Sequence, residues 1–418
     1  MTRGDGEKIY GGETMKKAVM YGGGNIGRGF VGAIFSKAGY EVTFIDVAEL
    51  VISEINARGE YPVRLSDNSG FSEEIVKNVR AVNGNDTGKA ADEIADCDIM
   101  ATAVGARILK FIVPNIAEGL RRRWKKTDRP LNILICENLN EANKILEELL
   151  LEQLAGPEKK LLAERVGLVE ASVGRMVPIQ TEDMKQGDPL RICTERYSFL
   201  PVDKAAFKGE IPEIADMIPF EPFDFYVKRK LYIHNMGHVV CAYLGMLSGS
   251  EYICRSIDDP EILQITENAM IESAMALSKE YDMPLDALIM HIQDLIERFG
   301  SELLRDTCAR VGADPSRKLG KADRLIGAGE LCLKHGILPA YIAIGAAGAV
   351  YAYLKETGKE NTPEEVKTVL KTVSGIETDG ELAKLILESC ANLSGGAALK
   401  ELRKRAQSKK YLSLNSII

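Results

Sequence analysis

The sequence lacks a hydrophobic run long enough to cross a bilayer. Its longest stretch of small apolar residues, Ala340–Leu354, falls short of the roughly 20 residues that a membrane helix needs. The first fourteen residues, MTRGDGEKIYGGET, contain no apolar segment either, so they predict neither a signal peptide nor a membrane anchor. We interpret residues 1–14 as a disordered extension that precedes the folded chain.

An excess of positive charge is also absent. The 418 residues carry a formal net charge of −8, which argues against a nucleic-acid partner or an anionic membrane surface. One basic tract, Arg121–Arg129, is interpreted as a solvated helix end and loop. None of the eight cysteines forms a Cys-x2-Cys pair, so neither a zinc site nor a disulfide framework is predicted. We expect a cytoplasmic protein with reduced core thiols and no bound metal.

A glycine-rich segment near the start carries the first functional signal. Ala18–Tyr21 predicts a short strand, and the pattern Gly22-x-Gly24-x-x-Gly27 then leads into a helix of small and apolar residues. A second strand, Glu41–Asp46, ends in an acidic residue. Such glycines permit a tight turn and a close approach of the backbone to a pyrophosphate, which the helix N-terminus would face. This order of strand, glycine loop, helix and acidic strand end predicts a dinucleotide-binding unit.

The acidic residue at the strand end also indicates which dinucleotide binds. Asp46 can accept hydrogen bonds from the adenosine ribose hydroxyls, and its charge would repel a ribose 2′-phosphate. No arginine follows it, so NAD(H) is predicted over NADP(H). A later strand within Asp96–Gly105 ends in a small, polar-poor turn suited to the nicotinamide or ribose edge. The predicted cofactor-binding residues are Gly22, Gly23, Gly24, Asn25, Ile26, Gly27, Arg28, Asp46, Val104 and Gly105.

The alternation of elements predicts the fold class. Further strands are expected within 131–138, 165–178 and 190–197, and strands that alternate with helices favour a parallel sheet. From about Pro222 onward, apolar residues recur at three- and four-residue spacing, which is typical of helices. We therefore predict an α/β Rossmann-type NAD-binding domain at 15–200 and a mostly α-helical substrate and catalytic domain at 201–418, with the boundary somewhere in 197–221.

The segment KLYIHNMGH, Lys230–His238, places three polar side chains among apolar neighbours. On a helix, Lys230, Asn235 and His238 point to about 0°, 140° and 80°, so one arc holds all three. A structural interpretation is a lysine whose stem covers apolar surface, a kink and a core histidine. The alternative is an active site, because a lysine on a partly buried face is costly unless it has a use.

Hydride transfer from an alcohol needs a base for the hydroxyl proton and donors for the developing alkoxide. No convincing zinc-ligand cluster is present, and the match of Tyr226-x3-Lys230 to a short-chain dehydrogenase motif lies outside the predicted sheet. A lysine is then the remaining base, because desolvation lowers the pKa of an ammonium group. The amides of Asn138 and Asn235 could bind the oxygen, and His238 could hold the substrate oxygen or orient the lysine. Asn138 could equally be a helix N-cap.

Lys230-x4-Asn235-x2-His238 resembles the K-x4-N-x2-H signature of the polyol-specific long-chain dehydrogenases and reductases. The stretches GGGNIGRGF, TAVG, ICEN and RVGADPSRKLGKADRLI are also similar to that family, and the resemblance covers Met15 to about Leu354. It implies a metal-independent, NAD-linked oxidoreductase that interconverts mannitol 1-phosphate and fructose 6-phosphate. It also implies that Lys230 is the general base, that Asn138 and Asn235 polarise the oxygen, and that His238 contacts the substrate.

One departure and several alternatives remain open. The family usually has an aspartate before the arginine of the strand that here reads ASVGRMVP, where this chain has Gly174, so the exact sugar is less secure. Arg317 and Lys318, in a basic segment, are the predicted contacts of a substrate phosphate, although a solvated basic loop would have the same composition. The alternatives are a mannitol 2-dehydrogenase, a hexuronate (fructuronate or tagaturonate) reductase, or a non-catalytic NADH-binding regulatory protein. The sequence predicts no oligomeric state.

Overall fold

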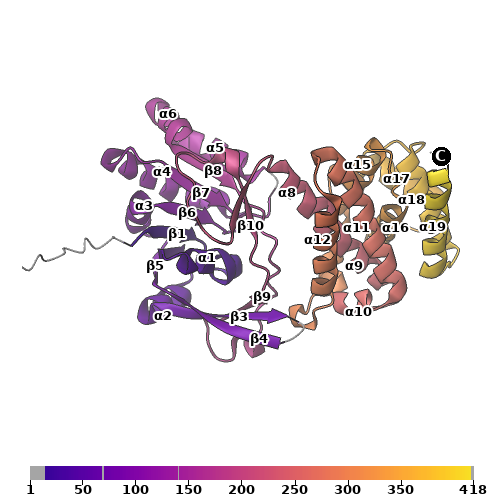
Figure 1. The fold of residues 1–418 in the computed structure, drawn as a ribbon, viewed down its shortest axis with the longest axis horizontal. Coiled ribbons are helices and arrows are strands. Elements are labelled where there is room, and N and C mark those ends of the chain that lie inside the picture. Colours follow the sequence, from indigo (N-terminus) through magenta and orange to yellow (C-terminus); the bar gives the residue numbers. More distant parts are fainter. Residues whose placement is uncertain (1–14, 68–69, 140, 416–418) are drawn as a thin grey trace, which may run out of the picture. The chain divides into compact units, whose positions relative to one another are not determined.

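The structure, a computed structural model, describes residues 15–67, 70–139 and 141–415 (Figure 1). The predicted extension, residues 1–14, lies outside these ranges. The chain divides into two compact units, of which the first ends at Phe220 and the second begins at Glu221. Two short strands between residues 200 and 220 belong to the first unit.

The first unit is built on a parallel sheet of six strands in the order β5-β2-β1-β6-β7-β8. Its strands are β1 (Lys17–Tyr21), β2 (Glu41–Asp46), β5 (Val79–Asn83), β6 (Ile99–Thr102), β7 (Leu131–Ile135) and β8 (Val166–Glu170). β1 lies inside the sheet, with β2 on one side and β6 on the other. Because these strands are parallel, the carboxyl ends of β1, β2 and β6 lie at the same edge of the sheet. Ligands of such sheets bind at this edge.

Helices cover both faces of this sheet (Figure 1). Alternate residues of β1 point to opposite faces: Met20 packs in one core with Phe30, and Val19 packs in a second core with Ile94 and Ile116. The helical segments of the unit are η1 (Gly27–Val31), α1 (Gly32–Lys37), α2 (Glu49–Arg58), α3 (Thr87–Asp96), α4 (Leu109–Lys126), α5 (Ala142–Gln153), α6 (Gly156–Arg165), α7 (Glu182–Lys185) and η2 (Lys204–Ala206). The predicted Rossmann-type architecture is confirmed.

Two smaller sheets complete the first unit. One has the order β4-β3-β9 and the other pairs β10 with β11 in parallel. Their strands are β3 (Glu60–Asp67), β4 (Gly70–Lys77), β9 (Ile192–Glu195), β10 (Leu200–Asp203) and β11 (Met217–Phe220). The prediction of β9 as part of the parallel sheet was wrong, because this strand pairs with β3, which the sequence analysis did not identify. The strand predicted at 165–178 is shorter than expected and ends at Glu170.

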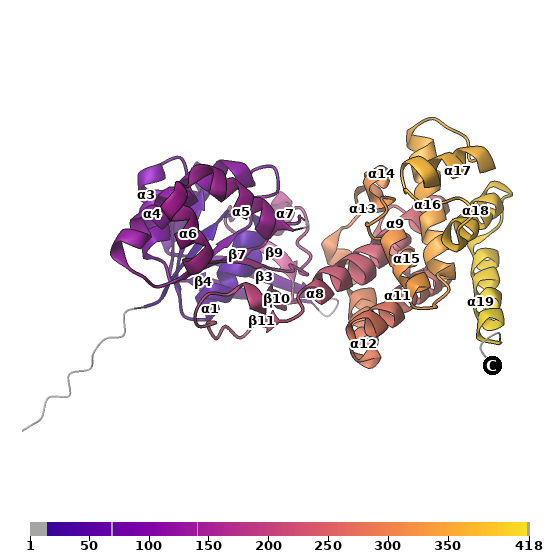
Figure 2. The same cartoon turned by 90° about the horizontal axis from the view of Figure 1, so that it is seen from above.

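The second unit is helical, as predicted. Figure 2 shows α9, α11 and α16 packed against one another within it. Its segments are α8 (Asp224–Arg229), η3 (Lys230–Asn235), α9 (Met236–Ser248), α10 (Ile253–Ile257), α11 (Pro260–Tyr281), α12 (Leu285–Phe299), η4 (Glu302–Leu304), α13 (Cys308–Gly312), α14 (Pro315–Lys318), α15 (Ile326–Lys334), α16 (Ala340–Glu356), α17 (Pro363–Thr372), α18 (Glu381–Ser394) and α19 (Leu399–Asn415).

Helix α16 contains the small-residue stretch noted in the sequence. A Cβ atom at Gly345 would lie only 2.4 Å from the Val240 side chain of α9, so glycine is needed for this close approach. Among the residues that the structure describes, no helix combines the length and the apolar character that a membrane crossing requires. The glycines and alanines of α16 therefore allow this helix to pack closely against its neighbours.

A buried carboxylate caps the beginning of α16. Glu272 of α11 is 1% exposed and accepts hydrogen bonds from the backbone N–H groups of Tyr341 (3.2 Å) and Ile342 (3.0 Å). The Lys410 ammonium of α19 lies 3.1 Å from the same carboxylate and also donates to the Leu338 carbonyl. Burial raises the pKa of Glu272 to about 7, even though Lys410 and the two N–H groups favour its charged form. This carboxyl therefore links three helices and titrates near neutral pH.

Candidate active site

The glycine loop has the geometry of a pyrophosphate cradle. Gly22 has a φ of +102°, and a Cβ there would lie 2.6 Å from the Ala103 carbonyl oxygen, so the turn requires glycine. A Cβ at Gly27 would lie 1.8 Å from the Gly22 carbonyl oxygen, which explains the close packing of helix and turn. A Cβ at Gly24 would meet nothing within 4 Å, and the helix begins at the next residue, Asn25. The loop thus leaves open space in front of the free amides of a helix N-terminus.

Asp46 is held against this loop. Its Oδ2 accepts a hydrogen bond from the Gly23 N–H at 2.6 Å, and its Oδ1 accepts from the N–H groups of Val47 (2.7 Å) and Ala48 (2.9 Å). Val47 and Ala48 are exposed, while Asp46 is half-buried. The carboxylate therefore sits at the end of β2 in a fixed orientation beside the glycine loop, which is the arrangement that ribose binding needs.

Arg28, predicted as a cofactor contact, is buried beneath the loop instead of exposed on it. Its Nε donates to the Gly23 carbonyl at 2.6 Å and its Nη1 donates to the Leu190 carbonyl at 2.6 Å. The side chain is 6% exposed, and burial lowers the pKa of its guanidinium, although the nearby Tyr61 and Asp46 oppose this shift. Arg28 thus shapes the backbone of the loop from below.

A buried glutamate orders the neighbouring strand end. Glu137, just after β7, accepts hydrogen bonds from the N–H groups of Val104 (3.0 Å) and Gly105 (2.7 Å), which follow β6. Sequence analysis missed this residue, although an acidic side chain directly after an apolar strand was a usable signal. Asn138 comes next and is exposed. It does not cap helix α5, whose N-cap residue is Glu141, so the alternative interpretation of Asn138 as an N-cap is wrong.

Lys230 begins a π-helical segment, η3, that joins α8 to α9. The Met236 N–H donates to the Leu231 carbonyl five residues earlier, as a π-turn requires. Residues five apart point about 140° apart on an α-helix, whereas i→i+5 bonding brings them closer in direction. Lys230 and Asn235 are five residues apart and both are half-buried. The π-turn therefore brings the directions of their two side chains closer together. We call η3 and α9 together the signature helix.

His238 follows on the same helix and is held from two sides. Its ring stacks on Phe299 of α12 with centroids 4.7 Å apart and planes 10° apart. Its Nε2 lies 3.3 Å from Asp306 Oδ2. Only 14% of the His238 side chain is exposed. The three signature residues therefore lie on one helical segment, and the histidine among them has a defined ring orientation.

A second histidine lies beside the signature residues. His234 is 6% exposed, and its ring centroid is 6.2 Å from that of His238. Burial lowers the pKa of His234 well below its usual value, and the positive charges of Arg298 and Lys230 act in the same direction. Burial likewise lowers the pKa of His291, on α12, to about 3. Both imidazoles are neutral at physiological pH, so they line this region with polar groups and add no charge to it.

The basic segment 310–324 runs beside the signature helix. The Tyr232 hydroxyl donates to the Ala322 carbonyl at 3.4 Å, and the Tyr243 hydroxyl donates to the Gly312 carbonyl at 3.0 Å. Both tyrosines belong to the signature helix, at its beginning and in its middle. The segment that holds the predicted phosphate ligands is therefore anchored to the same helix as the predicted catalytic residues.

The two predicted phosphate ligands differ in their surroundings. Arg317 has a half-exposed side chain that pairs with Asp314 (3.0 Å) and lies 3.6 Å from Asp323. Lys318 is 5% exposed, and within the described residues its ammonium makes no hydrogen bond or ion pair. Burial, together with the charges of Arg324 and Arg317, lowers the pKa of Lys318 to about 8. A buried ammonium beside two guanidinium groups is suited to an anionic ligand.

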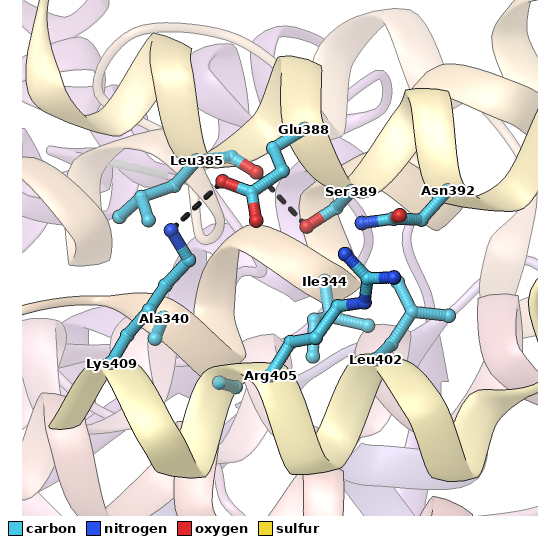
Figure 3. A pocket seen from close by; sticks show the side chains of 10 residues that line it. Ala340, Ile344, Leu385, Glu388, Ser389, Asn392, Leu402, Arg405 and Lys409 are labelled. Carbon is cyan, nitrogen blue, oxygen red and sulfur yellow. Dashed lines mark hydrogen bonds and ion pairs between the residues drawn. The ribbon is translucent and has the colours of Figure 1, made fainter. Parts of the chain in front are cut away.

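The described residues offer no cluster of metal ligands. Across residues 15–67, 70–139 and 141–415, no three His, Cys, Asp or Glu side chains gather as metal ligands would. All eight cysteines are buried, and none of them forms a disulfide bond. A pocket between α16, α18 and α19 is lined by none of the predicted site residues, and an ion pair between Lys409 and Glu388 (2.8 Å) borders it (Figure 3).

A parallel sheet with a glycine loop and a fixed acidic strand end, followed by a helical unit with a lysine, an asparagine and a histidine on one segment, defines a dinucleotide-linked dehydrogenase. The particular family is clear from comparison with known proteins. The mannitol dehydrogenase Rossmann domain matches residues 16–216, and the mannitol dehydrogenase C-terminal domain matches residues 223–394. The chain belongs to the mannitol dehydrogenase family.

Curated relatives are similar along nearly their whole length. Mannitol-1-phosphate 5-dehydrogenase of Bacillus licheniformis is 36% identical over 388 residues, which are 88% of this chain and 98% of that protein. The enzyme of the same name from Bacillus subtilis is 35% identical over 381 residues, 89% of this chain and 98% of its own. The resemblance noted in the sequence is therefore confirmed.

Solved structures are similar in fold. D-Sorbitol dehydrogenase in its substrate-free form has a TM-score of 0.77 at 16% identity, with 93% of this chain and 94% of that chain covered. Pseudomonas fluorescens mannitol 2-dehydrogenase, in a ternary complex with NAD and D-mannitol, has a TM-score of 0.71 at 14% identity, with 95% of each chain covered. At these identities the likeness concerns the fold alone.

Proposed function

We propose that the protein is an NAD-dependent, metal-independent dehydrogenase that interconverts mannitol 1-phosphate and fructose 6-phosphate. The observation that carries this proposal is the similarity, along nearly their full length, to relatives named mannitol-1-phosphate 5-dehydrogenase. The chain also has what the reaction needs: a cradle for a dinucleotide, a half-buried lysine as base, and a buried ammonium for a phosphate.

The residues of the first unit fit a bound NAD. The open space at Gly24 and the helix that starts at Asn25 would receive the pyrophosphate. Asp46, held in place by the Gly23 N–H, would accept from the adenosine ribose. The turn at Val104 and Gly105, ordered by Glu137, would border the nicotinamide end. NAD supplies the hydride acceptor when it is bound.

The signature helix would carry out the proton chemistry. Lys230 would take the proton of the hydroxyl that is oxidised and return it in ketone reduction. The amides of Asn235 and Asn138 would donate hydrogen bonds to the oxygen as negative charge develops on it. The π-turn supports this assignment, because it brings Asn235 toward the direction of Lys230, and such turns are frequent at functional sites. His238 would contact the substrate.

The phosphate of the substrate would bind at the basic segment. Lys318 is the stronger of the two ligands in this proposal, because its buried ammonium has no carboxylate bound to it in the described structure. Arg317 would have to exchange its pairs with Asp314 and Asp323 for the phosphate. Because tyrosines of the signature helix hold this segment, a sugar bound by its phosphate would have a fixed relation to Lys230.

A substrate panel tests the proposed function directly. Purified protein with NADH is offered fructose 6-phosphate, fructose, fructuronate and tagaturonate, and the loss of absorbance at about 340 nm is followed. We expect turnover with fructose 6-phosphate to exceed that of the other ketoses in kcat/KM. A preference for fructose would identify a mannitol 2-dehydrogenase, and a preference for a uronate would identify a hexuronate reductase. NADH binding without turnover of any ketose would identify a regulatory protein.

We place the protein in the cytoplasm, where its eight buried thiols stay reduced.

A further inference from the structure

Asp306 joins the signature histidine to the basic segment. Its Oδ2 lies 3.3 Å from His238 Nε2, and its Oδ1 accepts a hydrogen bond from Arg310 Nε at 2.7 Å. Only 9% of the Asp306 side chain is exposed. Burial alone would raise the pKa of this carboxyl, but the hydrogen bond with His238 and the charge of Arg310 outweigh it, so the pKa lies below its usual value. Asp306 is therefore an acceptor with no proton of its own at neutral pH.

The backbone holds Asp306 in position. Its carbonyl oxygen accepts a hydrogen bond from the Ile253 N–H at 2.9 Å, and the next residue, Thr307, forms a β-bridge with Tyr252. Thr307 then caps helix α13 by accepting from the Arg310 N–H. The carboxylate thus sits on a segment that is fixed at both sides, and it is not at the tip of a free loop.

These contacts determine which ring nitrogen of His238 carries the proton. A carboxylate can only accept, so the nitrogen that faces it, Nε2, must be the one that bears hydrogen. In a neutral imidazole the other nitrogen, Nδ1, is then an acceptor. The stacking on Phe299 fixes the plane of the ring. A ring turned over within that plane would place the carbon Cε1 against the carboxylate in place of Nε2 and lose the contact with Asp306.

We propose that Asp306 is a positioning residue that fixes His238 as the Nε2–H tautomer, so that Nδ1 accepts a hydrogen bond from a hydroxyl of the polyol substrate. This inference rests on the proposed function. With the opposite tautomer, His238 would present an N–H group to that hydroxyl and could no longer accept from it. The same carboxylate holds Arg310, so one side chain orients both the histidine and the beginning of the basic segment.

The test uses Asp306→Asn, which keeps the shape of the side chain but removes its charge. We expect kcat/KM for fructose 6-phosphate to fall about 10–100-fold, the range found when the partner that orients a functional histidine is lost. The Kd of NADH should not change, because the glycine loop belongs to the other unit. The same substitution in a His238→Asn background should cause a much smaller loss than in the wild type, since the part of its effect that passes through His238 is already gone. Losses that simply add would overturn the proposal.

The tautomer can be observed without any change in activity. In protein labelled with ¹⁵N-histidine, the nitrogen that bears hydrogen and the bare nitrogen have well-separated ¹⁵N shifts, and His238→Asn assigns the signals. We expect wild-type His238 to carry its hydrogen on Nε2 and Asp306→Asn to change this pattern. A wild-type His238 with hydrogen on Nδ1 would overturn the proposal even if the variant did not fold. This readout also stands if no ketose is turned over, so it separates this inference from the proposed function.

The chain offers a matched control. Glu280 holds another histidine and another cation in the same unit: its carboxylate lies 2.6 Å from His335 Nε2 and 2.6 Å from the Lys334 ammonium. Glu280→Gln should alter the signals of His335 only and leave kcat/KM at the wild-type value. An equal loss of kcat/KM in Glu280→Gln and Asp306→Asn would mean that both carboxylates act through stability, and it would contradict the proposal.

Discussion

The Asp46 carboxylate accepts a hydrogen bond from the Gly23 N–H at 2.6 Å, so the acidic end of β2 and the glycine loop form one structural unit. The same carboxylate also accepts from the two backbone amides that follow it. Its negative charge is therefore held where the adenosine ribose is expected, and it cannot swing aside to admit a phosphate.

This arrangement predicts the choice of cofactor. Wild-type protein should use NADH far better than NADPH, and Asp46→Ser combined with Val47→Arg should raise kcat/KM for NADPH. Activity with NADH should fall in the same variant, because Gly23 loses its acceptor. Kinetics with both cofactors measure the change, and Glu54→Gln, at an exposed pair with Arg58 on α2, serves as a control. A wild-type preference for NADPH would contradict the assignment of Asp46.

The second prediction concerns the base. Lys230→Ala should lower kcat by about 10²–10⁴-fold, the contribution of a positioned general base. NADH binding, measured by fluorescence, should survive, and small added amines should restore part of the alcohol oxidation. In the wild type, oxidation needs the neutral amine and should rise with pH, whereas ketone reduction needs the ammonium and should fall over the same range.

Lys228, on the preceding helix α8, gives a control. It is partly buried, but hydrogen bonds to Tyr281 and Asp224 outweigh that burial and raise its pKa, so it stays protonated and cannot serve as a base. Lys228→Ala should keep a kcat near the wild-type value. Near-normal turnover by a folded Lys230→Ala protein would remove Lys230 from the mechanism.

Chelation tests the proposed absence of a metal from the chemistry. If a lysine takes the proton, dialysis against EDTA should leave kcat/KM for fructose 6-phosphate unchanged. The activity should be measured before dialysis, after it, and after addition of zinc. Activity that is lost in EDTA and returns with zinc would show that a metal takes part.

The phosphate site makes a prediction about pH. Lys318→Met should raise KM for fructose 6-phosphate at least tenfold and leave KM for fructose, where measurable, unchanged. Because its pKa is lowered to about 8, Lys318 loses its charge as the pH rises through that value, and KM for the phosphate should rise with it. Arg317→Ala should have a smaller effect, and Lys321→Ala, at an exposed position, should have little. Equal effects on both sugars would indicate a structural role for this segment.

Glu272 predicts how stability depends on pH. Its pKa is raised from 4.5 to about 7, so between these values the folded state keeps a proton that the unfolded state has lost. Stability relative to Glu272→Gln should therefore fall as the pH rises through this window, by about 1.4 kcal/mol for each unit of pKa difference. Denaturant unfolding at several pH values measures the slope. Lys410→Met should extend the fall to higher pH, because the ammonium lowers the pKa of Glu272 in the folded state only. A difference between wild type and Glu272→Gln that is the same at every pH would contradict the assignment.

Local patterns were sufficient for much of the fold and for the geometry of the glycine loop. The glycine loop and Asp46 are close in sequence and follow rules of backbone geometry, so their places could be predicted. The helices of the second unit show a clear apolar period. Strands β3 and β4 were not identified, because β4 is largely exposed and carries little apolar alternation. The place of Arg28 was also not foreseen, since its partner Leu190 is 162 positions away.

The remaining site residues depend on contacts that spacing does not encode. Asp306 reaches His238 only because α12 and the segment after it fold back along the signature helix. Nothing in the spacing distinguishes His234 from its neighbours between Lys230 and Asn235, because its burial depends on the folded unit. The amino-acid composition does not reveal the π-turn either, because this turn differs from an α-turn only in which carbonyl oxygen accepts from each backbone N–H.

The π-turn at η3 amounts to one residue more than the α-helical register requires. Because the extra residue is taken up inside the turn, α8 and α9 keep the register of one continuous α-helix. With one residue deleted between Lys230 and Asn235, the helix would be regular, and Asn235 and His238 would follow the lysine at four and seven positions, about 40° and about 340° around the axis. The three side chains would still share one face. The five-residue spacing in this chain therefore does, with a π-turn, what a four-residue spacing would do in a regular α-helix.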